Sequence, residues 1–466
     1  MRGSAQTQSR RLLHFLLLRL PPLSSYPAPS DDRHESEVLP MTHYHLNDHD
    51  SHEPRETRNP VEQTTCCIVG GGPAGAVLAL LLARQGIPVV LLEAHLDFDR
   101  DFRGDTLHAS VMEIMDELGL AERLLQLRHA KVSNFSIPTR TGPFTFNLFA
   151  GLRTKFPYIT VMAQSQFLTF ITEEAKHYPH FRLMMGAHVD GLIEEEGIVV
   201  GVHYRGREVQ GAVRAALTVG TDGRFSQVRK LAGFTPIKTS SPIDVLWFRV
   251  SRREGDKTEA LSAQVGNGLF LIFIDRFDYW QVGCVIVKGG YPKVRAAGLA
   301  HLRQSLAAVA PDFADRFEEL TDWKHIAVLS VESSRLQRWH RPGLLLIGDA
   351  AHVMSPLGGV GINYAIQDAV VAANVLCSKL KTGTPLHERD LAEVQRQREL
   401  PTRIIQTFQA VAQRGVSAGI IQAQGERVFG IPRFVVPLLK LPWLLAVPAR
   451  FLSYGFCPPH VQPSKP

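Results

Sequence analysis

The sequence predicts an α/β protein: a Rossmann-like nucleotide-binding domain interleaved with an antiparallel-sheet domain and followed by a helical C-terminal region. A strand, a glycine-rich turn and a helix follow one another from residue 64. A second buried strand followed by glycines appears near residue 343, so we expect the chain to return there to its first domain. At 466 residues, the chain is long enough for two or three packed units.

The first unit is predicted to be a strand, a helix and a strand. Residues 64–69 form an apolar run of strand length, and residues 73–85 carry the continuous apolar surface of a buried helix. Gly86 is a suitable helix stop, and residues 87–92 predict a second buried strand. Apolar residues at helical spacing predict a further helix over residues 105–118.

The middle of the chain predicts a second, antiparallel unit. Three strands of mixed apolar and polar texture are centred on residues 246–250, 269–274 and 280–286. The elements expected after them are helices over residues 293–320, strands at 327–331 and 343–347, and a long helix over 360–380. The remainder of the chain is predicted to be mainly helical.

The composition is that of a globular protein, with 45% hydrophobic and 21% charged residues. The formal net charge of +6 is scattered along the chain, which argues against a nucleic-acid site. The five cysteines lack metal-ligand spacing, so we expect no metal site and reduced, buried thiols in a cytoplasmic protein. No uninterrupted apolar run is long enough to span a bilayer, but residues 429–456 could form a peripheral membrane anchor or a packed helix.

The first sixty residues differ from the rest. They are Arg-rich, then Pro/Ser-rich, then His/Asp-rich, which predicts a disordered extension over residues 1–60. Arg10 and Arg11 before an apolar run resemble a signal peptide, but Arg19 interrupts that run and no cleavage site follows. Met41 offers an alternative start.

Residues 70–75, Gly-Gly-Gly-Pro-Ala-Gly, fit a dinucleotide-binding fingerprint. Gly70 permits the tight turn, Gly72 lets the backbone approach a pyrophosphate, and Gly75 permits close packing of helix on strand. Glu93 ends the next strand, near the offset of roughly 20 residues at which an acidic side chain binds ribose hydroxyls. An exposed strand-end carboxylate is the alternative for Glu93. The fingerprint fits FAD and NAD equally, because both have an adenosine end.

A second signature distinguishes the two nucleotides. Asp349 closes an apolar strand, the position at which α/β sheets present ligand-binding groups. Pro356 and the glycines between 358 and 361 precede a helix whose positive end could face a reduced flavin. Another strand, turn and helix without special function is the alternative. The presence of this second signature together with the glycine fingerprint favours FAD over NAD.

A third motif lies at residues 220–229, Gly-Thr-Asp-Gly-Arg-Phe-Ser-Gln-Val-Arg. Alone, its Asp-Gly pair indicates a turn and Arg229 a surface cation. Together the three motifs, in family order and with family-like spacing, make residues 64–380 resemble the class A flavoprotein monooxygenases, which have the para-hydroxybenzoate hydroxylase fold.

The resemblance implies a set of FAD-binding residues. The residues implied at the ADP half are Gly70, Gly72, Pro73, Ala74, Gly75 and Glu93, with Val189 at the adenine through its backbone or in a packing role. Those implied at the ribityl chain and flavin are Arg103, Gln164, Asp222, Asp349, Pro356, Gly358, Gly359, Val360, Gly361 and Asn363. Asp222 would also take part in NAD(P)H interaction.

The resemblance also implies a reaction. NAD(P)H would be a transient electron donor, and a flavin C4a-hydroperoxide would transfer oxygen to an aromatic or lipophilic small molecule. Only one nucleotide fingerprint is visible, which agrees with transient docking of NAD(P)H. No motif indicates a catalytic base: His108, His352 and Tyr364 could equally be packed or capping residues. Tyr279 and Trp280 could face the substrate or belong to the core.

Three alternatives remain open from the sequence. An FAD-dependent reductase or dehydrogenase of the geranylgeranyl-reductase type would share the motifs. A flavin-dependent halogenase is less favoured, because its Trp-x-Trp motif is absent. A non-enzymatic protein could hold FAD as a structural or sensing ligand.

The expected division of the chain follows the motifs. The FAD-binding domain occupies residues 61–240, with an excursion to the second sheet near 130–160, and returns over 336–385. The antiparallel-sheet substrate domain lies between, at 241–335, and a helical C-terminal region covers 386–466.

Overall fold

The computed structural model describes residues 61–99, 105–139, 142–147, 149, 151–207, 209–256, 261–422 and 449–462. The predicted extension over residues 1–60, Arg103 and most of the apolar segment at 429–456 therefore lie outside the described residues. The elements described below belong to one compact unit, which begins at Arg58.

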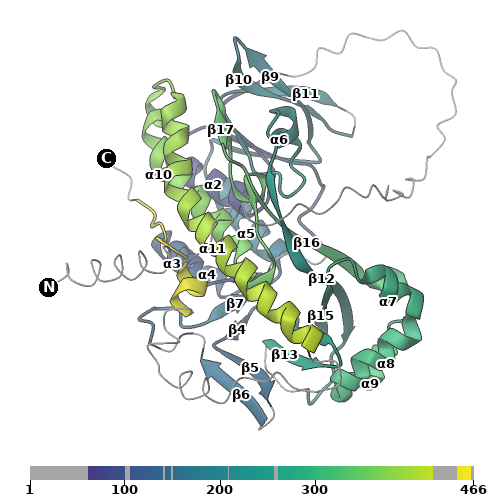
Figure 1. The fold of residues 1–466 in the computed structure, drawn as a ribbon. Helices are drawn as coiled ribbons and strands as arrows, with labels where there is room; N and C mark the ends of the chain where they lie inside the picture. Colours follow the sequence, from purple (N-terminus) through teal and green to yellow (C-terminus); the bar gives the residue numbers. More distant parts are fainter. Residues whose placement is uncertain are drawn as a thin grey trace, which may run out of the picture. The chain divides into compact units, whose positions relative to one another are not determined.

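The first sheet has eight strands, and its main path runs β17-β18-β11-β1-β2-β8. Its strands β9, β10, β11 and β17 are labelled in Figure 1. The strands on this path are β1 (Val61–Val69), β2 (Val89–Glu93), β8 (Phe181–Met185), β11 (Gln210–Gly220), β17 (His340–Arg341) and β18 (Leu344–Leu346). Off the path, β10 (Ile198–Arg205) pairs with β11 and with β9 (His188–Glu195). β1 pairs in parallel with β2 and β11, and β11 pairs in parallel with β18. The predicted Rossmann-like sheet and the return of the chain near residue 343 are confirmed.

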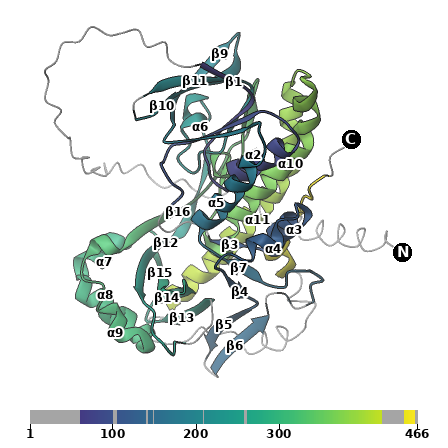
Figure 2. The same ribbon diagram turned by 180° about the vertical axis from the view of Figure 1, so that it is seen from behind.

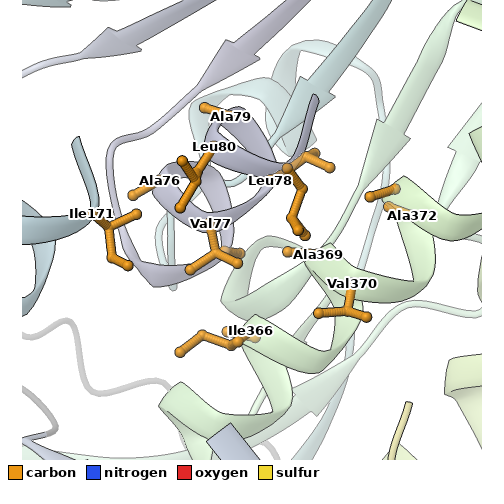
Figure 3. Close-up of a cluster of buried hydrophobic side chains, with 14 of the residues drawn as sticks. Ala76, Val77, Leu78, Ala79, Leu80, Ile171, Ile366, Ala369, Val370 and Ala372 are labelled. Atoms are coloured by element: carbon orange, nitrogen blue, oxygen red, sulfur yellow. The ribbon is translucent and has the colours of Figure 1, made fainter. Parts of the chain in front are cut away.

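Helices packed on the first sheet enclose its core. They are α2 (Pro73–Arg84), α3 (Ala109–Glu117), α4 (Ala121–Leu124), α5 (Gln164–Lys176) and α10 (Gly361–Thr382), with α6 (Gln227–Leu231) near β9. Every residue of α2 from Ala74 to Ala83 is buried. Figure 3 shows Val77 and Leu80 of α2 among Ile366, Ala369 and Val370 of α10 and Ile171 of α5. Such all-round apolar character belongs to a helix in the middle of a core.

One helix of the described residues, Leu357–Thr382, is long and apolar enough to cross a membrane by length and composition. Of its most apolar window, 78% is buried inside the protein. Its apolar side chains pack on α2, so their burial is accounted for by the core of this domain.

The second sheet is antiparallel and has six strands in the order β13-β14-β15-β12-β16-β19. Its strands are β12 (Ile237–Ser251), β13 (Leu261–Gly266), β14 (Leu269–Asp275), β15 (Tyr279–Val287), β16 (Ala327–Arg335) and β19 (His352–Val353). Helices α7 (Tyr291–Ala297), α8 (Leu299–Val309) and α9 (Ala314–Phe317) lie beside it in both ribbon views (Figures 1 and 2). The predicted antiparallel unit is confirmed, and it includes more strands than the three expected.

Short elements complete the fold. β3 (Thr106–Leu107), β4 (Ala130–Val132) and β7 (Ile159–Val161) form a three-stranded sheet, and β5 (Asn134–Thr139) pairs with β6 (Gly142–Asn147). The 3-10 turns are η1 (Pro311–Phe313), η2 (Trp323–His325), η3 (Gly348–Ala350) and η4 (Leu357–Gly359). The C-terminal helix α11 (Glu388–Gln422) has 35 residues and lies along α10. A helical turn at residues 449–454 follows in the last described segment.

Several sequence expectations need correction. The helix predicted from residue 105 begins only at Ala109, because Thr106 and Leu107 pair with β7 and His108 is extended. The helical stretch predicted over 293–320 breaks at Gly298, whose φ is +91°, and again at Pro311. The thiols are not all buried, since Cys457 is exposed.

Candidate flavin site

The glycine loop between β1 and α2 has two crowded positions and one open position. A Cβ on Gly75 would lie 2.0 Å from the carbonyl oxygen of Gly70, and one on Gly70 would lie 2.7 Å from the backbone of Asp222. These two glycines therefore let β1, α2 and the end of β11 meet. A Cβ on Gly72 would meet no heavy atom closer than 3.9 Å. Gly72 borders open space ahead of the helix, where a pyrophosphate can approach the N–H groups of the first turn.

Glu93, the last residue of β2, is brought to this loop. Its carboxylate accepts hydrogen bonds from the backbone N–H of Gly71 at 2.8 Å and of His95 at 2.9 Å. The residue is 7% exposed, so the alternative of an exposed strand-end carboxylate is wrong. An acceptor fixed at the end of β2 beside the glycine loop is the arrangement that holds a ribose in nucleotide-binding folds.

The turn η3 after β18 lies against the same loop. Gly348 has a φ of +61°, and a Cβ on it would be 3.2 Å from that of Ala74 in the first turn of α2, after Pro73 at the helix start. The next residue is Asp349, at the carboxyl end of the parallel strand β18. The fold therefore brings the predicted fingerprint and the Asp349 turn together.

The Asp-Gly motif supports that turn from the other side. Asp222 accepts hydrogen bonds from the Ser226 hydroxyl at 2.5 Å and from Val228 N–H at 2.9 Å, so it is tied to the start of α6, whose N-cap is Ser226. Burial raises the pKa of Asp222 despite these bonds. From α6, the Arg229 guanidinium donates to the carbonyl of Ala350 at 2.9 Å. Arg229 is 7% exposed, so the interpretation of a surface cation is wrong.

The loop η4 and the start of α10 form the third part of the site. Gly358 and Gly359 have φ values of +81° and +62°, conformations that favour glycine. The carbonyl of Gly359 accepts a hydrogen bond from the Thr106 hydroxyl at 2.9 Å. The Asn363 amide donates to the carbonyls of Thr106 and Gly359, both at 3.1 Å, and accepts from His108 N–H at 2.8 Å. These bonds of Asn363 fix the loop to β3.

The remaining predicted residues lie in different surroundings. Pro356 precedes η4, Val360 is buried and Gly361 begins α10. Gln164 begins α5, and its N–H donates to the Asp105 carboxylate at 3.2 Å. Val189 is buried in the core formed by β9, β10 and β11, which agrees with a packing role for its side chain.

None of the three side chains without an assigned role is free in solvent. His108 lies at the amino end of α3, where its Nδ1 is 2.9 Å from the carbonyl oxygen of Leu452, and burial lowers its pKa to about 4. His352 lies 2.6 Å from the Asp368 carboxylate. Tyr364 is buried below the Arg398 guanidinium, 5.3 Å from the ring centre.

The residues present fit an FAD molecule. Gly72 leaves room for a pyrophosphate, and Glu93 supplies an acceptor beside it. Asp349 follows Gly348, at which a Cβ would lie 3.2 Å from Ala74 of α2 and 3.4 Å from Ala365 of α10, the helix that follows η4. The fold thus brings the turn after β18 against the glycine loop and against α10, which agrees with a dinucleotide site.

Comparison with protein families decides the cofactor. Residues 63–397 match the family described as "FAD binding domain". The chain belongs to this FAD-binding family. The predicted FAD cofactor is therefore confirmed.

Curated relatives of this FAD-binding protein are monooxygenases. The 6-methylpretetramide 4-monooxygenase of Streptomyces rimosus is 36% identical over 333 residues, which cover 71% of this chain and 78% of the relative. The rifampicin monooxygenase of Streptomyces venezuelae is 29% identical over 332 residues, 65% of this chain and 61% of the relative. The chain is an FAD-dependent monooxygenase of the class A type.

The fold agrees with a solved flavoenzyme. The anhydrotetracycline hydroxylase OxyS from Streptomyces rimosus superposes with a TM-score of 0.66 at 23% identity, over 84% of this chain and 76% of that chain. At this identity the likeness shows a shared fold.

Sequence reasoning missed two groups of residues near the site. The first is the ion pair between Asp105 and Arg276, which joins the Gln164 end of α5 to the β14–β15 turn. The second is a row of buried polar side chains on α11. The sequence signal for the second group was a long helix with glutamines at helical spacing and few apolar positions.

Proposed function

We propose that this FAD-dependent monooxygenase uses NAD(P)H to hydroxylate a planar, largely apolar aromatic molecule of several rings, bound on the face of the second sheet that carries Trp247, beside the end of α11 that packs on this face. The observation that carries this proposal is a partly exposed apolar surface on that face. Trp247, Phe270, Ile272 and Leu329 are each only partly buried, although they occupy strands in the middle of the sheet.

Strand alternation separates this face from the core. Side chains on a strand point alternately to the two faces of its sheet. Phe248, Phe273 and Trp280 lie on the face that packs against α8 and α9, with the Trp280 and Phe313 ring centres 5.7 Å apart. Trp280 is therefore a core residue. Tyr279, one position earlier, lies on the Trp247 face, where Arg249 stacks on its ring at 4.9 Å.

Gly283 leaves space for the side chain of Trp247. The two residues are paired between β12 and β15, and a Cβ on Gly283 would lie 2.8 Å from the indole ring. Because glycine has no side chain, the indole can lie directly against the sheet at this position. A flat, partly exposed indole next to Phe270 and Ile272 suits an aromatic substrate, because aromatic rings stack with offset or edge contacts.

One end of the apolar face reaches the proposed flavin site. Gln281, on the same face, accepts a hydrogen bond from Arg276 Nε at 2.9 Å. Arg276 pairs with Asp105, whose carboxylate binds the backbone of Gln164. A substrate on the sheet would thus have the flavin segments at one end.

The relatives support the same class of substrate. One acts, by its name, on 6-methylpretetramide, and another is named an anhydrotetracycline monooxygenase. For this chain we propose a substrate of similar size and aromatic character. NAD(P)H would dock transiently, because only one nucleotide fingerprint is present in the sequence.

The residues of this chain would have separate tasks. Bound FAD would supply electron transfer and oxygen activation. Glu93, the Gly70–Gly75 loop and Asp349 would hold it, while the backbone of η4 would border its ring. The apolar face would orient the substrate and exclude water.

The test follows flavin and oxygen separately. The purified flavoprotein is mixed without oxygen with NADPH and with NADH, and loss of the oxidised flavin absorbance is recorded. Isotopically labelled dioxygen is then added with anhydrotetracycline and smaller phenols as probes. Reduction by a nicotinamide and labelled oxygen in a multi-ring product are expected. Reduction followed by hydrogenated product without label would instead establish a reductase.

A further inference from the structure

Helix α11 turns a polar face toward the interior of the protein. The buried polar residues on it are Gln395, Arg398, Thr402, Gln406, Gln409, Gln413 and Ser417. They are separated by three or four positions, so they lie along one side of the helix. Buried polar groups are costly unless they are hydrogen-bonded, so this polar face needs partners.

Two of the glutamines bind the backbone that leads into the flavin loop. The Gln409 amide donates to the carbonyls of Ser355 at 2.9 Å and Leu357 at 2.8 Å, on both sides of Pro356. The Gln406 amide donates to the carbonyl of Val353 at 3.0 Å. The segment between β19 and η4 is thus held to α11 by side-chain hydrogen bonds.

Helix α11 is also linked to the loop that contains Asp349, because Arg398 binds Asp368 and Asp368 binds the backbone of Gly348. Arg398 Nε donates to Asp368 Oδ1 at 2.7 Å. Asp368 Oδ2 accepts from the backbone N–H of Gly348 at 3.0 Å and lies 2.6 Å from His352 Nε2. Arg398, Asp368 and His352 are all buried. Burial alone would raise the pKa of Asp368, but the interactions with His352 and Arg398 outweigh it and hold the pKa below its ordinary value.

The matched family domain ends at residue 397, just before these contacts begin. We propose that α11 positions the flavin site: Gln409 fixes the Pro356 segment and Arg398, through Asp368, fixes the Gly348–Asp349 turn. The inference rests on the proposed placement of FAD between these two segments. Gln409 and Arg398 touch neither cofactor nor substrate in this account, so they are positioning residues.

The same helix supplies a matched control. Gln395 is also buried, and it also bonds to two backbone groups: it donates to the carbonyl of Gln337 at 2.7 Å and accepts from Trp339 N–H at 2.9 Å. Its partners lie between β16 and β17 in the chain, and neither of them belongs to the Pro356 segment or to η4. Gln395→Met and Gln409→Met therefore remove equivalent bonds at different places.

The experiment uses the full chain, freed of FAD and titrated with FAD. We expect Gln409→Met to raise the Kd for FAD about tenfold and to change the visible circular dichroism of the bound flavin. Gln409→Met and Gln395→Met should lower the thermal midpoint of the apoprotein by similar amounts. The Kd of Gln395→Met for FAD should nevertheless stay within about twofold of the wild-type value. The dichroism reports the surroundings of the flavin ring, which a merely structural role would leave unchanged.

The opposite result overturns the inference. If Gln409→Met and Gln395→Met lose similar stability and both bind FAD with the wild-type Kd and dichroism, α11 is only a structural support. Should Gln409→Met not fold, Gln406→Met, which removes the bond to Val353, is judged by the same criteria. Failure of the wild-type apoprotein to bind FAD would count against the proposed site itself, a distinguishable outcome.

Discussion

Arg398 and Asp368 form an ion pair in which Nε and Oδ1 are 2.7 Å apart and both side chains are almost completely buried. The pair joins α11 to α10, and the second carboxylate oxygen of Asp368 holds the backbone of Gly348. A buried charge pair costs desolvation free energy, so breaking it on one side leaves an uncompensated charge.

Arg398→Met should therefore lower the free energy of unfolding by about 3–5 kcal/mol. The double variant Arg398→Met/Asp368→Asn should recover part of this loss, because the carboxylate that has lost Arg398 is then neutral. Urea unfolding of the apoproteins measures the free energy of unfolding of the single variant and of the double variant. Arg396→Met, which removes an exposed guanidinium from the same helix, is the control and should leave the midpoint unchanged. Equal losses in the single and double variants would contradict the pairing.

Two glycines of one loop should respond differently to substitution. Gly75→Ala places a methyl group 2.0 Å from the Gly70 carbonyl oxygen, so it should destabilise the apoprotein. The Cβ of Gly72→Val meets no heavy atom closer than 3.9 Å in the protein, so the apoprotein should keep its thermal midpoint. The valine should nevertheless block the pyrophosphate and raise the Kd for FAD about a hundredfold. Normal FAD binding by a folded Gly72→Val protein would refute this location of the pyrophosphate.

Stability should fall in mild acid because of His108. Its pKa is about 4 in the folded chain, chiefly through burial, against an ordinary value of 6.5. Between these values the unfolded chain binds a proton that the folded chain does not. The free energy of unfolding is therefore full above about pH 6.5 and falls by about 3 kcal/mol as the pH drops to 4.

The check is urea unfolding of the apoprotein across this range of pH. His108→Gln should flatten the curve between pH 6.5 and 4, whereas His301→Gln, at an exposed position, should leave the slope as in wild type. A His108→Gln protein with the wild-type slope would assign the acid sensitivity to other groups.

Gly283→Val should disturb substrate binding through Trp247. The new side chain would displace the indole, which lies 2.8 Å from the position of the first added carbon. We expect the Kd for anhydrotetracycline, used as a multi-ring probe, to rise about tenfold. Val328→Ala, on the opposite face of the same sheet, should change it little. Equal binding by wild type and Gly283→Val would remove Trp247 from the substrate surface.

The parts of the fold that depend on local patterns were predictable. The apolar run before Gly70 and the glycine spacing indicate β1 and α2, and the apolar run before Asp349 indicates β18. Such signals are local because one strand, one turn and one helix start suffice to produce them. The fold then brings the two glycine-containing segments together, as the shared nucleotide fold requires.

The contacts between distant segments were not predictable in the same way. Trp280 and Trp247 are equally apolar, and only the register of β12 with β15 decides which of them faces the core. The glutamines of α11 are typical of an exposed helix surface by composition, yet their partners are carbonyls more than fifty positions earlier in the chain. A hydrogen bond between residues so far apart leaves no pattern in the sequence near either residue.

The measurement that tests the flavin site most directly is FAD titration of wild-type apoprotein and of Asp349→Ala. Wild type should bind one FAD per chain. Asp349→Ala should bind FAD at least about tenfold more weakly in a variant that is folded as apoprotein, because the strand-end acceptor beside the glycine loop is lost. Unchanged FAD affinity in the folded variant would contradict the placement of the cofactor between Gly72 and the η3 turn.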